Sequence, residues 1–180
     1  MLKNIIAIAF VTILITVAFV YEPPAKTETV AVAPAVDTTP QTPENTALLG
    51  EAFAILKADH VSVGDTPTYN SNPPTSGPHA NALPWGFNTS EISDINAVHN
   101  LEHGGIWISY KDISAEQIAV LKTIATANSG SVIVSPRAAN DSPVAVVSWG
   151  RLMQLDTVDI EQINQFITTN KNNSPEPLAR

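Results

Sequence analysis

Residues 93–110 read SDINAVHNLEHGGIWISY, and this stretch decides the fold. Ser93 and Asp94 are residue types that cap helix N-termini, and the paired glycines further along are typical of a helix end. We therefore predict a short helix that runs to His103. The apolar residues 106–110 that follow predict a strand. A helix that leads directly into a strand indicates a domain in which helices pack on a sheet.

The sequence downstream continues this alternation. Ser114 with Gln117 resembles a capping box and predicts a helix through about Ala127, whose apolar positions keep helical spacing. Residues 131–135 and 144–149 are apolar runs typical of buried strands. The turn residues between these two runs predict that they form a hairpin.

The remaining segments complete an α+β prediction. Apolar spacing predicts a helix over residues 47–58 and a last helix that starts at Asp156 or Thr157. Residues 60–63 resemble a short strand, and the polar tail from Lys171 is expected to fray. The predicted fold is a small mixed β-sheet with helices packed on it.

The N-terminus predicts a membrane anchor. Residues 5–21 form an uncharged apolar run near the lower length limit for a bilayer-spanning helix. Lys3 before the run orients the remainder outside. We expect an uncleaved transmembrane signal-anchor at 1–21, a linker rich in Pro, Thr and Ala at 22–46, and an extracytoplasmic domain at 47–180. A cleaved signal peptide would begin similarly, but the residues after the run do not resemble a cleavage site.

Composition excludes several functional classes. The formal net charge is −8 and the pI is about 4.8, so nucleic acid is not an expected partner, because phosphate binding needs clustered Lys and Arg. The chain contains no cysteine, which excludes disulfides, thiolate metal sites, thiol nucleophiles and a lipoprotein anchor.

The segment His99-Asn100-Leu101-Glu102-His103 carries the most specific chemistry. Histidines four apart on a helix project from one face, where two imidazoles can bind one Zn or Cu ion. The segment also fits the H-x-x-E-H pattern of inverzincin peptidases, in which Glu102 would activate a metal-bound water. Alternatively, Glu102 pairs with His103 or Lys111, and the histidines are hydrogen-bonded core residues.

A second histidine comes from a loop. Residues 67–85 are rich in proline and predict a long loop, and such loops are often functional. Its prolines and Gly77 would present His79 rigidly, as a binding site requires. The alternative is a structural turn whose histidine faces water.

These two motifs, PPTSGPH at 73–79 and HNLEHGG at 99–105, together resemble the domain-of-unknown-function 3105 family. The resemblance covers roughly residues 60–166. It implies a bacterial protein of the cell membrane with a single N-terminal anchor and one extracytoplasmic domain, and it implies no established activity. The positions that match the family motifs are His79, His99, Glu102 and His103.

Three functions remain open from the sequence. The first is a Cu- or Zn-binding domain that uses His79, His99 and His103, with Glu102 as a ligand or as a partner of a ligand. The second is a Zn-dependent hydrolase with Glu102 off the metal. The third is a metal-free interaction module, which predicts that His79 lies far from the other two histidines. His60, the fourth histidine, is either an extra ligand or a plain surface residue, and its place beside a predicted strand favours the surface residue. The sequence identifies neither the ion nor a protein partner.

Overall fold

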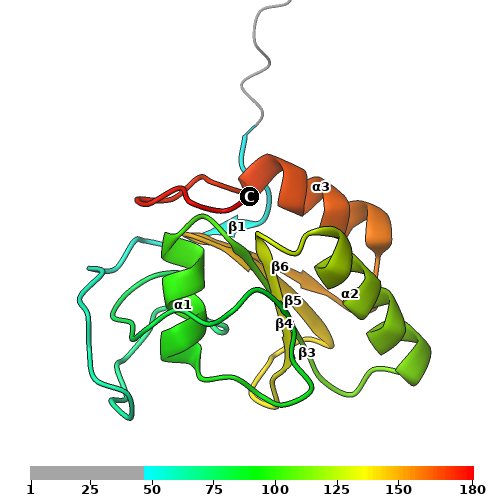
Figure 1. The fold of residues 1–180 in the computed structure, drawn as a ribbon, viewed down its shortest axis with the longest axis horizontal. Coiled ribbons are helices and arrows are strands. Elements are labelled where there is room, and N and C mark those ends of the chain that lie inside the picture. Colours follow the sequence, from blue (N-terminus) through cyan, green and yellow to red (C-terminus); the bar gives the residue numbers. More distant parts are fainter. Residues whose placement is uncertain (1–46) are drawn as a thin grey trace, which may run out of the picture. The chain divides into compact units, whose positions relative to one another are not determined.

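The computed structural model describes residues 47–180, which Figure 1 shows in sequence colours. The predicted anchor at 1–21 and linker at 22–46 lie outside the described residues. Within 47–180, no helix has the length and apolar character needed to cross a bilayer. The described elements are, in chain order, β1 (Glu51–Ala52), β2 (Gly86–Phe87), α1 (Asp94–Glu102), β3 (Ile106–Tyr110), α2 (Ala115–Ala127), β4 (Val132–Pro136), β5 (Val144–Ser148), β6 (Arg151–Leu155) and α3 (Ile160–Asn170).

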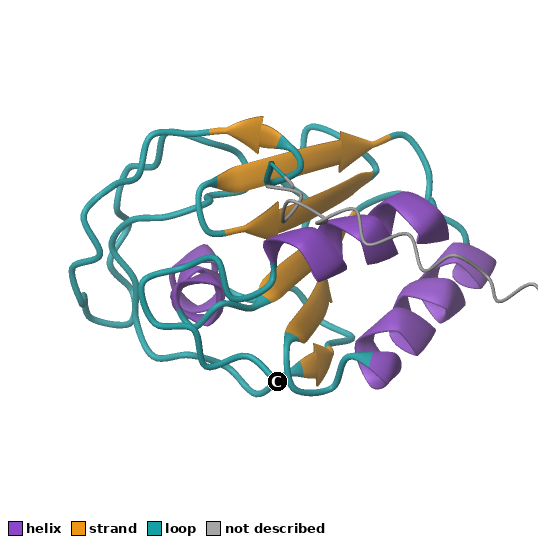
Figure 2. Ribbon diagram, turned by 90° about the horizontal axis from the view of Figure 1, so that it is seen from above, coloured by secondary structure: helices purple, strands orange, loops and turns teal. Residues whose placement is uncertain are grey.

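The strands of the described region form one six-stranded mixed sheet in the order β1-β6-β5-β3-β4-β2. β3 lies in the middle, parallel to β4 and antiparallel to β5. Every residue of β3 and β5 is buried, because helices or loops cover both faces of the sheet, as Figure 2 shows from above. Burial on both faces explains why these strands read as nearly continuous apolar runs.

The helices divide between the two faces of the sheet (Figure 1). Ile106 and Ile108 of β3 belong to the core beneath α2 and α3, whereas Trp107 belongs to the core beneath α1. Neighbouring strand residues point to opposite faces, so β3 contributes to both cores. The structure therefore confirms the predicted α+β class, with a mixed sheet and helices packed on it.

The stretch that carries α1 and β3 folds as the sequence predicts. Ser93 is the N-cap residue of α1, although its side chain makes no capping hydrogen bond. The helix ends before Gly104, which has a φ of 82°, a left-handed conformation that glycine adopts without strain. The strand over residues 106–110 is confirmed.

The capping box of α2 is also confirmed. The Gln117 N–H donates to Ser114 Oγ at 3.3 Å, and the Ser114 N–H donates to Gln117 Oε1 at 3.2 Å. α3 begins later than predicted because Asp159 supplies its cap: the Gln162 N–H donates to Asp159 Oδ1 at 3.0 Å. Both helices start where a side chain accepts from the first free amides.

The predicted hairpin between residues 131–135 and 144–149 is wrong. β3 lies between β4 and β5, and β5 instead forms a hairpin with β6, a strand that the sequence analysis did not predict. The physical reason is the crossover through α2, which places β4 parallel to β3 along one of its edges. β5 then pairs with the free edge, and Gly150, with a φ of 71°, turns the chain into β6.

The predicted helix over 47–58 is also wrong. Residues 51–52 form the edge strand β1, antiparallel to β6. The Asn170 side chain pairs with the backbone of Leu49: the Leu49 N–H donates to Asn170 Oδ1, and Asn170 Nδ2 donates to the Leu49 carbonyl, both at 2.9 Å. Gly50 has a φ of 83°, outside the helical region. These tertiary contacts override helical spacing, which is a weak prior.

Two further local predictions need correction. The expected strand over 60–63 is reduced to one parallel bridge between His60 and His79. The tail after α3 is not frayed, since Leu178 and Ala179 donate their N–H groups to the His103 carbonyl, each at 3.0 Å. The His103 carbonyl at the end of α1 thereby gains two donors, as the free carbonyls of a helix C-terminus require.

Candidate metal centre

The helix α1 brings His99 and His103 together, as the four-residue spacing predicts. Their ring centroids are 4.5 Å apart, and their Nε2 atoms are 3.1 Å apart. Val98 and Leu101 of the same helix are fully buried against the sheet. Because these apolar residues fix the rotation of α1, the two imidazoles are held at its opposite, more exposed side.

The proline-rich loop brings His79 to the same place. His79 is fully buried, and its ring centroid is 4.7 Å from that of His99. The His79 N–H donates to the Asp59 carbonyl, and its own carbonyl accepts from the Val61 N–H, both at 2.9 Å. The metal-free interaction hypothesis predicts that His79 lies far from His99, and this prediction is wrong.

His60 joins these histidines because the bridge to His79 aligns the two backbones. Its ring centroid lies 4.7 Å from that of His79 and 5.2 Å from that of His99. His60 is exposed, as the sequence analysis expected. It also faces the other imidazoles, and this position is compatible with the alternative role of an extra ligand.

Glu102 faces His79 from the last turn of α1. Its Oε2 atom lies 3.0 Å from His79 Nε2, and both side chains are almost fully buried. The distance suits an ion pair if His79 is protonated, but neither atom has a hydrogen-bond partner among the described residues. Buried polar atoms without a partner are rare in folded proteins, so this pair requires a physical explanation.

The hydrogen bonds of the Nδ1 atoms show which nitrogen of His79 and of His99 carries the proton. Nδ1 of His79 lies 2.9 Å from the Gly77 carbonyl, and Nδ1 of His99 lies 2.5 Å from the Ala80 carbonyl. A carbonyl oxygen only accepts, so each Nδ1 carries the proton and, in the neutral ring, each Nε2 carries a lone pair. Metal-binding histidines are oriented by this kind of hydrogen bond.

The His99 side chain favours its neutral form. Burial lowers the pKa of His99 below its ordinary value, although the hydrogen bond to the Ala80 carbonyl opposes this effect. The neighbouring imidazoles of His103 and His79 lower the pKa further. A neutral imidazole is the form that binds a metal ion.

We call His60, His79, His99 and Glu102 the histidine cluster, because one donor atom from each lies within 4.8 Å of all the others. A second group with the same spacing consists of Glu102, His103 and Glu176. The site predicted from the sequence is therefore divided: His79, His99 and Glu102 lie in the histidine cluster, whereas His103 lies in the second group and shares only Glu102 with the cluster. The sequence suggested His60 only as a possible extra ligand and gave no sign of Glu176, because their positions depend on the bridge to His79 and on the folded tail.

Residues 60–180 match the family model described as protein of unknown function (DUF3105). The chain belongs to the DUF3105 family. The match begins at His60 and includes every residue of the histidine cluster. No curated protein and no solved structure matches the chain.

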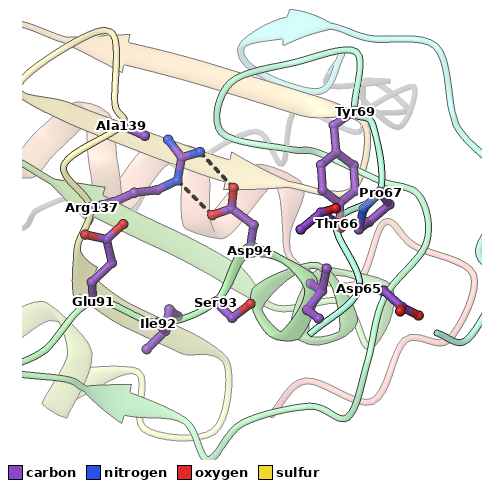
Figure 3. A pocket seen from close by; sticks show the side chains of 11 residues that line it. Asp65, Thr66, Pro67, Tyr69, Glu91, Ile92, Ser93, Asp94, Arg137 and Ala139 are labelled. Atoms are coloured by element: carbon purple, nitrogen blue, oxygen red, sulfur yellow. Dashed lines mark hydrogen bonds and ion pairs between the residues drawn. The ribbon is translucent and has the colours of Figure 1, made fainter. Parts of the chain in front are cut away.

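A partly buried ion pair anchors the other end of α1 in this DUF3105 domain. Arg137 donates from Nε and Nη2 to the two Asp94 carboxylate oxygens, both at 2.8 Å, as Figure 3 shows. Arg137 Nη1 also donates to Asn72 Oδ1 at 2.7 Å, in the proline-rich loop. The bidentate pair fixes the start of the helix that carries the histidines and ties it to the loop that presents His79.

The same ion pair borders a polar pocket of about 330 Å³ (Figure 3). Asp65, Glu91 and Asp94 line it with carboxylates. Arg137 is the described lining residue with a positive charge, and Asp94, Asn72 and Asn140 already accept its hydrogen bonds. This pocket therefore has no free cationic donor for an anionic ligand, and we assign the candidate site to the histidine cluster.

Proposed function

We propose that this DUF3105 domain binds a transition-metal ion, Zn or Cu, through the histidine cluster. One observation carries the proposal: the buried Nε2 of His79 and Oε2 of Glu102 are 3.0 Å apart without a hydrogen bond. Two donors of a tetrahedral ion with bonds of about 2.0–2.2 Å are roughly 3.3 Å apart. An ion between these atoms would satisfy both of them.

His79, His99 and Glu102 are the proposed core ligands, and the exposed His60 would complete the coordination. Neutral imidazole with carboxylate suits Zn or Cu(II). A soft site for Cu(I) would need sulfur, and the chain has no cysteine. Met153 packs in the core under α2 and α3, on the opposite face of the sheet from α1. We therefore expect a site for a divalent ion.

Glu102 is better suited to a ligand role than to a catalytic one. The hydrolase hypothesis needs this carboxylate off the metal and beside a bound water. Its side chain is only 7% exposed and lies against His79, which is fully buried. We therefore favour metal binding over hydrolysis as the function of the cluster.

Metal analysis of the full-length chain, free of any affinity tag, tests the proposal. We expect about one tightly bound Zn or Cu ion per chain after loading and gel filtration. His79→Ala combined with His99→Ala should abolish this binding. All four histidines of the chain lie in or beside the cluster, so the control is Glu161→Gln, an exposed change in α3. A wild-type chain that stays metal-free after exposure to both ions overturns the proposal.

For the cellular setting, we propose a single-pass membrane anchor at 1–21 with the domain on the extracytoplasmic side. The uncharged run at 5–21 and the preceding Lys3 support this orientation. Fractionation with an alkaline wash should leave the protein in the membrane pellet. An added protease should reach residues 47–180 in cells whose cytoplasmic membrane is intact.

A further inference from the structure

A second group of donor atoms lies directly beside the histidine cluster. One donor atom each from Glu102, His103 and Glu176 lies within 4.8 Å of the other two. His103 Nε2 is 3.3 Å from Glu176 Oε2. Glu102 belongs to this group and to the histidine cluster, so its carboxylate stands between the two.

The position of Glu176 is set by the backbone of the C-terminal tail. The Glu176 N–H donates to the Glu102 carbonyl at 3.1 Å. Two residues later, the Leu178 N–H donates to the His103 carbonyl at 3.0 Å. These bonds hold the tail against the end of α1, so the Glu176 side chain meets His103 because of the fold.

Exposure rises across this group, since the side chains of Glu102, His103 and Glu176 are 7%, 25% and 57% exposed. One imidazole and two carboxylates form a harder donor set than the histidine cluster. Such a set suits a borderline divalent ion such as Zn, with remaining positions taken by water.

We propose that Glu102, His103 and Glu176 hold a second divalent ion, with the Glu102 carboxylate bridging it to the ion in the histidine cluster. Paired metal sites have ions about 3.5–4 Å apart, a separation that one carboxylate can bridge. This inference rests on the proposed function, because the bridge needs the first ion. The second site would also include a residue of the C-terminal tail. Binding of the second ion would therefore strengthen the attachment of the tail to α1.

A single-ion centre is the competing arrangement. His99 Nε2 and His103 Nε2 are 3.1 Å apart, so both imidazoles can reach one ion. In that case Glu176 remains a surface residue that contributes nothing to metal binding. The number of bound ions and the behaviour of the tail separate the two arrangements.

The experiment titrates the full-length, tag-free chain with Zn²⁺ by calorimetry and follows hydrogen exchange of the Leu178 and Ala179 amides. We expect about two Zn²⁺ per chain, with the amides gaining protection as the second ion binds. Glu176→Gln should weaken the second site about tenfold or more and leave the first intact. Its backbone bonds remain, so the tail stays folded. Glu161→Gln makes the same charge change away from the site and should change neither step.

The outcomes separate this inference from the proposed function. One ion per wild-type chain, or two ions bound equally tightly by Glu176→Gln, overturns the second site and leaves the first standing. Amide protection that does not follow the second binding step overturns the role of the tail. A chain that binds no ion overturns the proposed function together with this inference.

Discussion

His79 Nε2 and Glu102 Oε2 lie 3.0 Å apart in the buried interior, and neither atom has a hydrogen-bond partner among the described residues. His79 Nδ1 donates its proton to the Gly77 carbonyl, so whenever the ring carries a single proton, its Nε2 lone pair faces a carboxylate oxygen. Two facing acceptors repel each other without a cation between them. In that form we expect the pair to cost stability in the metal-free protein and to gain stability on metal loading.

The first prediction concerns Glu102→Gln. The amide can donate to His79 Nε2 and replace a repulsion with a hydrogen bond, which contributes about 0.5–1.5 kcal/mol. We expect the metal-free variant to melt at a higher temperature than the metal-free wild type, while its metal affinity falls. Calorimetric melting with and without a chelator measures both effects. A lower melting temperature in the metal-free variant would instead identify the pair as a protonated histidine bound to a carboxylate.

The second prediction compares two histidines. His60 is exposed, so His60→Ala should change the metal-free free energy of unfolding by less than about 0.5 kcal/mol. His79 is fully buried, so His79→Ala should cost more, because it leaves a cavity and a free Gly77 carbonyl. Both variants should weaken metal binding. Denaturant unfolding of the chelator-treated proteins measures the free energies of unfolding. An unchanged metal affinity in His60→Ala would show that His60 is not a ligand.

The third prediction concerns the ion pair at the start of α1. Arg137→Ala removes the bidentate donor of Asp94 and the donor of Asn72, and we expect a loss of at least about 2 kcal/mol of unfolding free energy. This value allows for Asp94, whose side chain is 31% exposed. Arg151→Ala is the matched control, because its guanidinium makes one long contact, to the Gly50 carbonyl at 3.4 Å. Equal losses in the two variants would contradict the anchoring role.

The fourth prediction concerns pH. Burial, and then the negative charge of Asp94, raise the pKa of Tyr69 to about 12 from its ordinary value of 10.0. The folded state therefore favours the neutral phenol, and the stability that Tyr69 contributes is lost as pH rises from 10 through 12. Its hydroxyl donates to the Pro78 carbonyl at 2.7 Å, next to His79.

Ultraviolet titration of the wild type against Tyr69→Phe isolates the phenolate signal of Tyr69. We expect this difference signal to appear near pH 12, and the alkaline loss of stability to be smaller in Tyr69→Phe. A difference signal near pH 10 in the folded protein would show that the hydroxyl is not held by the loop.

The fifth prediction concerns the end of α1. Gly104 has a φ of 82°, and a Cβ there would lie 2.9 Å from Asn172 Cα. Gly104→Ala should destabilise the fold and displace the tail from α1, because both strain and contact oppose the added carbon. Gly64 has a φ of 103° but open space around it, so Gly64→Ala is a control for strain alone. Thermal melting should rank Gly104→Ala as the less stable variant.

Local signals predicted the fold wherever they agreed with tertiary packing. The cap at Ser114, the glycines after His103 and the apolar run 106–110 gave α2, α1 and β3 their correct places. Strand order was not predictable in this way, since the pairing of β5 depends on which edge of β3 the α2 crossover leaves free. Residues 47–58 have helical spacing, yet contacts with Asn170 and β6 hold part of this segment extended.

The candidate site likewise divides into residues that local signals predict and residues that only tertiary contacts bring together. His99, Glu102 and His103 were predictable because one helix fixes their spacing. His79 was predictable as a rigidly presented residue, although nothing in its loop specified where it would point. His60 and Glu176 reach the site through backbone hydrogen bonds between segments distant in sequence. Such contacts between distant segments cannot be predicted from the periodic pattern of a single sequence.

The bridge between His60 and His79 has a consequence for a chain without cysteine. The donors of the histidine cluster come from three separate segments, at His60, at His79 and in α1. A bound ion would cross-link these segments much as a disulfide does, by restricting the unfolded chain. Unlike a disulfide, this cross-link resists thiol reductants and opens in acid or with a chelator. Its strength would then depend on the metal supply around the protein.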